Sequence, residues 1–278
     1  MKFNPLKIAA ILLSMTLGLA SCGPKDKYNL PELQVSHEPS PRNVVLEEYT
    51  GVNCGFCPDG HERAAMLAAA YPGRVSLISI HQGSYASRYA TQWGNALAAL
   101  SGVTGYPVGT VNRQLFSGQS LAMGRELWSA AAESVMSEPS CANLVARALI
   151  LQEERKMVVD VKGYYTAASA ASTNMLNVAV LQNEIIGPQT NYGNYNRAYI
   201  TADGQYRHMH MLRDLITGQW GEEIAAAAGT EFSRRYEYAI PEKIANEAMV
   251  LDNLQVIVFL AESHQDIITG VEAEIIMR

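Results

Sequence analysis

The chain of 278 residues lacks the glycine-rich phosphate loop, the dinucleotide-binding fingerprint and the nucleophilic-serine elbow of three large enzyme classes. It has no internal repeat, which argues against a solenoid. Basic residues are in deficit, with 21 Lys and Arg against 27 Asp and Glu and a formal net charge of −6. This acidic balance argues against nucleic acid or an anionic membrane surface as a partner.

Long apolar runs are also scarce, and the one candidate lies at the N-terminus. Lys2 and Lys7 precede the mostly apolar run Ile8–Leu19, which is too short to span a bilayer comfortably. The small residues directly before Cys22 resemble a bacterial lipobox, in which the cysteine receives lipid. We therefore predict a lipoprotein signal peptide over residues 1–21 and membrane attachment through a lipid on Cys22. The alternative is an ordinary signal peptide with an incidental cysteine.

Cleavage before Cys22 would remove two lysines and no acidic residue, which changes the formal charge from −6 to −8. Residues 22–42 are polar and punctuated by prolines, so we interpret them as a lipidated tether. Two domains are predicted after the tether, over residues 43–138 and 142–278.

Cysteine is rare, with four in the whole chain. Lipid on Cys22 would leave Cys54, Cys57 and Cys141, an odd number that cannot pair fully within one molecule. An exported chain meets an oxidising environment, where Cys54 and Cys57 can persist as a disulfide. Cys141 is then either a small buried apolar residue or a resolving or intermolecular thiol.

The most informative motif is Cys54-Gly55-Phe56-Cys57, because of what surrounds it. A strand-like run, Val44–Thr50, precedes it, a helical run over 58–70 follows it, and Tyr106-Pro107 comes before another extended segment. A strand, a C-x-x-C motif opening a helix and a distant proline loop are typical of a thioredoxin-like redox site. A structural disulfide and half of a metal site are the alternatives.

The motif assigns roles to its two cysteines. Amide groups at the helix start favour the thiolate of Cys54, which we predict to be the nucleophile. Cys57, one turn further, would resolve the mixed disulfide. A Cys/Cys/His metal site with His61 lacks an evident fourth ligand, so no metal or other cofactor is predicted.

Five further residues complete the predicted site. Glu48 lies on the strand that feeds the motif and could move the proton of Cys57; a solvated carboxylate is the alternative. Pro107 is the candidate for a cis peptide bond, or else an ordinary proline at a strand entry. Tyr106, Gly55 and Phe56 are the candidate substrate-binding residues.

The two halves of the chain differ in pattern. Over 43–138, strands alternate with helices, the last of them expected over 121–136, which indicates an α/β unit. After 142, strand-like segments dominate, which favours an all-β sandwich of immunoglobulin-like type. Residues 187–230 interrupt that pattern with a Tyr/Asn-rich loop and a helix expected around Met209–Ile216, and a turn is expected near Ile268–Gly270.

Several motifs together resemble the outer-membrane lipoprotein family named for a twenty-eight-kilodalton outer membrane protein. They are Leu46–Gly51, Cys54–Pro58, Gly102–Pro107 with Val111–Arg113, Met211–Asp214 and Gly218–Gly221. The resemblance implies an outer-membrane location and a thioredoxin-like domain followed by an immunoglobulin-like domain. It also implies Cys54, Cys57 and Pro107 as the redox constellation, but Asn53 stands where classical thioredoxins have tryptophan.

Two functions follow as hypotheses. The first is a lipid-anchored thiol–disulfide oxidoreductase, facing the periplasm or the cell surface, whose partners are the thiols or disulfides of exported proteins. The second is a redox-inert surface lipoprotein that acts as a binding or assembly module through its β domain. Solvent access to Cys54 separates them, because covered sulfur atoms favour the second.

Overall fold

The computed structural model describes residues 26–278, so the predicted signal peptide and the lipid-accepting Cys22 lie outside the described residues. The chain divides into two compact units, Met1–Glu32 and Leu33–Arg278. In the second unit, the remainder of the predicted tether has no regular element apart from an isolated bridge between Pro41 and Pro139. The two predicted domain ranges both fall in this second unit, and the boundary between them stays a prediction.

Few helices interrupt a large number of strands. The helices are α1 (Cys57–Ala70), α2 (Gly94–Ser101) and α3 (Trp128–Met136), with short 3₁₀ turns at Ser87–Tyr89, Arg197–Tyr199 and Leu251–Asn253. The strands are β1 (Val44–Thr50), β2 (Val75–His81), β3 (Val108–Val111), β4 (Met123–Gly124), β5 (Ala142–Leu151), β6 (Lys156–Tyr165), β7 (Thr173–Gln182), β8 (Ile185–Gly187), β9 (Tyr206–His208), β10 (Met211–Leu215), β11 (Glu222–Ala225), β12 (Glu231–Ala239), β13 (Lys243–Ile244), β14 (Glu247–Ala248), β15 (Leu254–Ala261), β16 (Ile267–Glu272) and β17 (Glu274–Met277). The fold is therefore mostly β.

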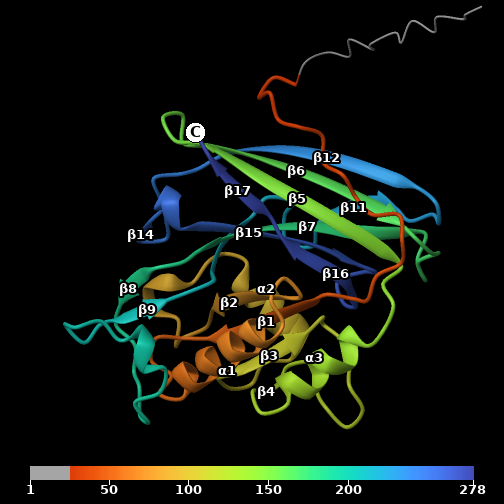
Figure 1. Cartoon of the computed structure of the whole chain (residues 1–278). Helices are drawn as coiled ribbons and strands as arrows, with labels where there is room; N and C mark the ends of the chain where they lie inside the picture. Colours follow the sequence, from red (N-terminus) through yellow and green to blue (C-terminus); the bar gives the residue numbers. More distant parts are fainter. Residues whose placement is uncertain (1–25) are drawn as a thin grey trace, which may run out of the picture. The chain divides into compact units, whose positions relative to one another are not determined.

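One mixed sheet contains strands from both halves of the sequence (Figure 1). Its order is β16-β15-β7-β10-β2-β1-β3-β4, and β11 also pairs with β7. The junction lies between β10 and β2, which run parallel with Met211 opposite Ser79. The amide of Ser79 donates a hydrogen bond of 2.8 Å to the carbonyl oxygen of His210 at the same place.

The alternation of side chains along β1 decides which residues face which layer. Leu46 packs in a cluster with apolar residues of α1 and α3. Val45 packs in another cluster, with residues of α2, β7 and β15. Because successive side chains of a strand point to opposite faces, Glu48 lies on the α1 side and Glu47 on the other side.

A second sheet, in the order β12-β6-β5-β17, packs on the β7 and β15 part of the first. Every second residue along a strand points into the core between the two sheets, as Val159 and Val161 of β6 and Val178 and Val180 of β7 do. Burial of branched aliphatic side chains between the two sheets supplies most of the favourable free energy of folding of this half.

Asn112 and Arg113 join the two halves just after β3. The buried Asn112 side chain accepts a hydrogen bond from the Val45 amide and donates to the carbonyl oxygens of Asn43 and Ile267. Arg113 forms a buried two-pronged ion pair with Glu47 at 2.7 and 2.5 Å. Both residues have positive φ, a conformation that asparagine tolerates better than most residues.

Three expected elements differ in the structure. Residues 211–215 form the central strand β10 instead of a helix, because this short segment pairs with β2 on one side and β7 on the other. The periodicity of so short a segment does not by itself separate a strand from a helix. The turn expected near Ile268–Gly270 lies inside β16, which pairs with β15. The helix expected over 121–136 begins only at Trp128 and follows the short strand β4.

Replacement of Arg113 by methionine should lower the free energy of unfolding by about 3–5 kcal/mol, because it leaves Glu47 buried without a partner. Urea unfolding of the purified variant measures this change. The double variant Glu47→Leu/Arg113→Met should lose less than the single one. A matched surface change, Arg207→Met, whose partner Glu184 is more than a third exposed, should cost at most about 1 kcal/mol; equal losses in Arg113→Met and Arg207→Met would contradict the prediction.

Candidate functional site

The disulfide Cys54–Cys57 lies at the start of α1, with the two Cα atoms 5.4 Å apart. The helix begins at Cys57 and has proline in its first turn, where a missing amide hydrogen costs little. Asp59, also in the first turn, places a negative charge near the positive end of the helix dipole. The local sequence therefore favours a helix that starts at the second cysteine.

Cys54 opens onto a groove, whereas Cys57 is fully buried. Cys54 is 5 % exposed and Cys57 0 %. The groove has a volume of about 300 Å³ and is lined by Asn53, Cys54, Gly55, Phe56, Tyr85, Thr104, Gly105, Tyr106 and Tyr192. None of these side chains is an acid or a base that is charged at neutral pH. Phe56, Tyr85 and Tyr192 are also among the most exposed large hydrophobic residues of the described chain.

A segment from the second half of the sequence, residues 189–192, lies over the cysteine loop. The Gln189 side chain donates to the Cys54 carbonyl oxygen at 2.9 Å, and the Thr190 amide donates to Val52 at 2.8 Å. The Tyr192 amide donates to the Gly55 carbonyl oxygen at 2.9 Å, and the Tyr192 ring meets the Phe56 ring edge to face. This overlying segment covers much of the loop and forms one wall of the groove.

The predicted proline packs against the first turn of α1. The Tyr106–Pro107 bond is cis. A Cβ atom added to Gly60 would lie 2.7 Å from Glu48 Oε1 and 3.0 Å from Pro107 Cβ, so the absence of a side chain there lets the three residues meet. Gly60 is one helical turn after Cys57, which brings Glu48 and Pro107 to the same end of the helix as the disulfide.

Glu48 is buried, and no charged side chain lies as close to it as Arg113 lies to Glu47. Burial raises the pKa of Glu48 well above its usual value, and the positive charge of Arg125 opposes this shift only in part. Its Oε1 atom forms no hydrogen bond. Such a carboxyl group keeps its proton to a higher pH than usual and can release it to a nearby base.

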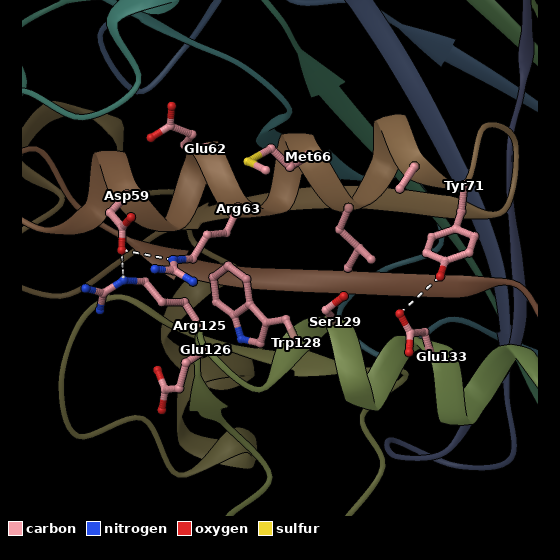
Figure 2. A pocket seen from close by; sticks show the side chains of 12 residues that line it. Asp59, Glu62, Arg63, Met66, Tyr71, Arg125, Glu126, Trp128, Ser129 and Glu133 are labelled. Carbon is pink, nitrogen blue, oxygen red and sulfur yellow. Dashed lines mark hydrogen bonds and ion pairs between the residues drawn. The ribbon is translucent and has the colours of Figure 1, made fainter.

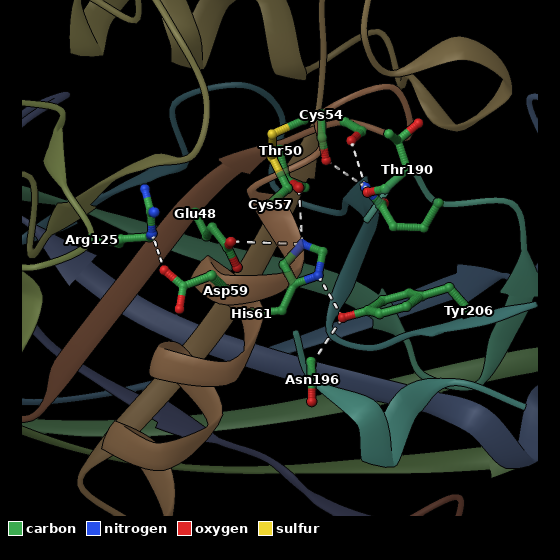
Figure 3. A network of polar contacts seen from close by, with 12 residues as sticks. Glu48, Thr50, Cys54, Cys57, Asp59, His61, Arg125, Thr190, Asn196 and Tyr206 are labelled. Carbon is green, nitrogen blue, oxygen red and sulfur yellow. Dashed lines mark hydrogen bonds and ion pairs between the residues drawn. A yellow bond between two sulfur atoms is a disulfide. The ribbon is translucent and has the colours of Figure 1, made fainter. Parts of the chain in front are cut away.

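A network that the sequence did not reveal extends from Glu48 (Figure 3). His61 Nε2 lies 2.9 Å from Thr50 Oγ1 and 3.6 Å from Glu48 Oε1, and His61 Nδ1 lies 2.9 Å from the hydroxyl of Tyr206. Asn196 donates to the same hydroxyl at 2.9 Å. The sequence suggests His61 only as a metal ligand, and nothing in it connects His61 with Tyr206, 145 positions away.

A larger groove of about 480 Å³ lies between α1 and α3 (Figure 2). Asp59 at its end forms ion pairs with Arg63 and Arg125. Burial alone would raise the pKa of Asp59, but the hydrogen bonds and charges of the two arginines outweigh it and lower the pKa. These pairs fasten the start of α1 to the loop before α3, so we assign this groove a structural role.

Other candidate chemistry is limited within residues 26–278. Cys141 is a free, partly buried thiol whose pKa is raised by burial and then by the charge of Glu262. No three His, Cys, Asp or Glu side chains of these residues are grouped so that they could hold a metal ion. None of the described helices is long and apolar enough to cross a membrane.

The model of the family "Outer membrane protein Omp28" matches residues 94–276, more than half of the chain. The chain belongs to the Omp28 family. It is accordingly an outer membrane protein, as the sequence predicted. The match begins after the disulfide, so Omp28 membership does not by itself include the two cysteines. Among curated proteins, none matches the chain.

Two solved structures share the fold of most of this chain. HBP35 of Porphyromonas gingivalis matches with a TM-score of 0.67 and 23 % identity, over 85 % of this chain and 76 % of that chain. A protein from Agrobacterium tumefaciens matches with a TM-score of 0.50 and 10 % identity, over 84 % and 95 %. A domain of the outer membrane lipoprotein Omp28 from Porphyromonas gingivalis matches with a TM-score of 0.33 and 19 % identity, over 50 % and 91 %.

Replacement of Glu48 by glutamine should raise the free energy of unfolding of the oxidised chain, relative to the parent, by more at pH 7 than at pH 4. The folded-state pKa is raised, so the unfolded chain ionises first, and stability falls as the pH rises from about 4.5 towards the folded pKa, by up to about 1.4 kcal/mol per pH unit. Glutamine cannot ionise and removes this loss. Urea unfolding at both pH values measures the difference between Glu48→Gln and the parent.

The groups that face Glu48 are His61, Arg125, Tyr206 and His210. Burial lowers the pKa of His61 to about 3, so it stays neutral across this range. The exposed Glu126→Gln is the matched control. An advantage of Glu48→Gln that is the same at pH 4 and pH 7 would show that Glu48 titrates normally.

Proposed function

We propose that the chain is a lipid-anchored, thioredoxin-like oxidoreductase that exchanges disulfides with exported proteins. The observation that carries the proposal is the position of Cys54. It lies next to a disulfide partner at a helix start and lines an uncharged groove with exposed aromatic walls. Structural disulfides are usually packed on all sides, whereas exchange needs one sulfur atom that a partner can reach.

The arrangement of the first half supports a thioredoxin-like assignment. β1 pairs in parallel with β2 and antiparallel with β3, and α1 and α3 share one face of these strands. In the second half, the sheet β12-β6-β5-β17 packs on the β7 and β15 part of the mixed sheet, which supports the sandwich assignment. The finer, immunoglobulin-like topology of that sandwich remains part of the proposal.

The exchange would proceed in two balanced steps. In the reduced chain, the Cys54 thiolate attacks one sulfur of a substrate disulfide, forms a mixed disulfide and releases the other substrate sulfur as a thiolate. Cys57 then gives its proton to the Glu48 carboxylate, and its thiolate attacks the Cys54 sulfur, which breaks the mixed disulfide and releases the second substrate sulfur as a thiolate. The Cys54–Cys57 disulfide forms, and the substrate has gained two electrons; the same steps reversed oxidise a substrate.

The groove favours an extended protein segment as the substrate. Tyr106, Gly55 and Phe56 line it beside Cys54. The Tyr192 ring fills the space over Gly55, so a bound segment would reach the Gly55 backbone only after Tyr192 moves. Because no charged side chain lines the groove, apolar or aromatic residues next to the substrate cysteine should bind best.

The Cys57→Ser variant should accumulate a mixed disulfide between Cys54 and a disulfide-containing protein such as insulin, because the resolving thiol is gone. Non-reducing gels and mass spectrometry of the cysteine pair measure it. The unaltered chain with dithiothreitol should reduce insulin, Cys54→Ser should fall to the uncatalysed rate, and Cys141→Ser should keep the activity. Equal turnover in Cys54→Ser and the unaltered chain would refute the proposal.

A second function, a redox-inert binding or assembly module, is favoured by one observation. Cys54 is almost fully covered, and residues 189–192 are hydrogen-bonded to its loop. If this segment never moves, substrate sulfur atoms cannot reach Cys54, and the groove would bind partners without electron transfer.

The accessibility of Cys54 in the reduced chain decides between the two. Alkylation by iodoacetamide should modify Cys54 before Cys57, and Tyr192→Ala should raise the rate several-fold, because it removes one wall over the cysteine loop. Tyr195→Ala, three residues after Tyr192 and outside the groove lining, is the control. A Cys54 that reacts only after denaturation, even in Tyr192→Ala, would leave the binding module as the function.

A further inference from the structure

His61 occupies a position that links the two halves of the chain behind the disulfide. It lies on α1, four residues after Cys57, and its imidazole is nearly buried. One ring nitrogen faces Thr50 and Glu48 of β1, and the other faces Tyr206 of β9 (Figure 3). The ring therefore connects the buried carboxyl group with a strand that comes from the other half of the sequence.

The hydrogen bonds of Tyr206 fix which nitrogen of His61 carries hydrogen. Asn196 can only donate through its Nδ2 atom, so the Tyr206 oxygen accepts this bond. The single hydrogen of the hydroxyl then goes to its other partner, His61 Nδ1. A neutral imidazole whose Nδ1 accepts must carry its hydrogen on Nε2, which faces Thr50 and Glu48.

A small cavity lies in the space between these groups. Its volume is about 20 Å³, and its polar lining comes from Glu48, His61, Ser79, Tyr199, Tyr206 and His210. This volume is enough for one water molecule, and the lining supplies more than the two to four polar partners that a buried water needs. Oε1 of Glu48, which has no hydrogen-bond partner in the protein, is on the carboxyl group that lines this cavity.

The electrostatics keep the imidazole neutral. Burial lowers the pKa of His61 to about 3, and the charges of His208 and His210 add to this effect. Glu48 has its pKa raised by burial. The contact of 3.6 Å between them is therefore a neutral donor beside a carboxyl group, and not a permanent ion pair.

We propose that His61 is a positioning residue for the exchange and controls how readily Glu48 exchanges its proton. Held in one tautomer by Tyr206, His61 directs its Nε2 hydrogen at Thr50 Oγ1, 2.9 Å from Nε2, and Glu48 Oε1 lies 3.6 Å from the same nitrogen. The hydrogen turns towards the Glu48 carboxylate when that forms, directly or through one water. This inference rests on the proposed function, because Glu48 accepts the proton of Cys57 in the second step. When the carboxylate forms, the Nε2 hydrogen stabilises it, and without this hydrogen the carboxylate is buried with less compensation.

The test measures the titration of Glu48 itself, by isotope-edited infrared spectroscopy of its carboxyl group in the oxidised full chain. This readout needs no redox activity. In His61→Leu, which fills the space but has no donor, the titration of Glu48 should move to higher pH by about one unit. His61→Gln, which restores a donor, should return the titration most of the way.

Two further variants guard against misfolding as the explanation. Tyr206→Phe keeps the ring and removes the hydroxyl that orients His61, so it should shift the titration in the same direction by a smaller amount. Tyr199→Phe, which lines the same cavity and has no hydrogen bond to His61, should leave it unchanged. The groups that also face Glu48 and remain in place are Arg125 and His210.

The outcomes separate this inference from the proposed function. An unchanged Glu48 titration in folded His61→Leu overturns the inference, even if insulin reduction proceeds. A shifted titration that glutamine reverses supports it, and if the chain exchanges disulfides, His61→Leu should also slow the resolution of the mixed disulfide about tenfold at pH 7. A shifted titration in a chain without exchange supports the control of Glu48 by His61 and refutes only the redox function.

Discussion

Main-chain pairing between β2 and β10 is the constraint on which the arrangement of the site depends. It places a strand of the second half in the middle of a sheet that begins in the first half. Because β10 is fixed there, the chain before it must pass over the end of α1, and it carries residues 189–192 and Tyr206 with it. The wall of the groove and the environment of His61 both follow from this one junction.

Adjacent glutamates on β1 illustrate how a single strand can assign opposite tasks to the same residue type. Glu47 points to the face where Arg113 and Thr110 satisfy its oxygens, so its buried charge is compensated, and the paired Arg113 in turn donates to the His264 carbonyl oxygen of the second half. Glu48 points to the α1 face, where Arg125 acts only at a distance and one oxygen has no partner. A paired buried carboxylate is structural, whereas an uncompensated one is suited to proton transfer.

The groove and the polar network lie on different sides of the same helix start, and they place different demands on the chain. The groove exposes aromatic surface next to Cys54, which is useful only if something binds there. The network buries polar groups next to the first turn of α1, which is costly unless they are connected. Omp28 family membership accounts for the outer-membrane location. The family match begins at residue 94, after the cysteines, so the proposed chemistry rests on the groove and the network.

The sequence by itself determined the local elements whose signals are contained within a few residues. The strand over Val44–Thr50, the helix that starts at Cys57 and the family to which the chain belongs could all be recognised, because patterning, capping and motifs act over short range. The opposite faces of Glu47 and Glu48 also follow from the sequence, since alternation along a strand needs no tertiary information. Only the tertiary structure decided that 211–215 is a central strand, that Tyr192 covers the cysteine loop and that Tyr206 orients His61. These depend on pairing and packing between residues more than a hundred positions apart, and the free energy of such contacts is not encoded in any local window of the chain.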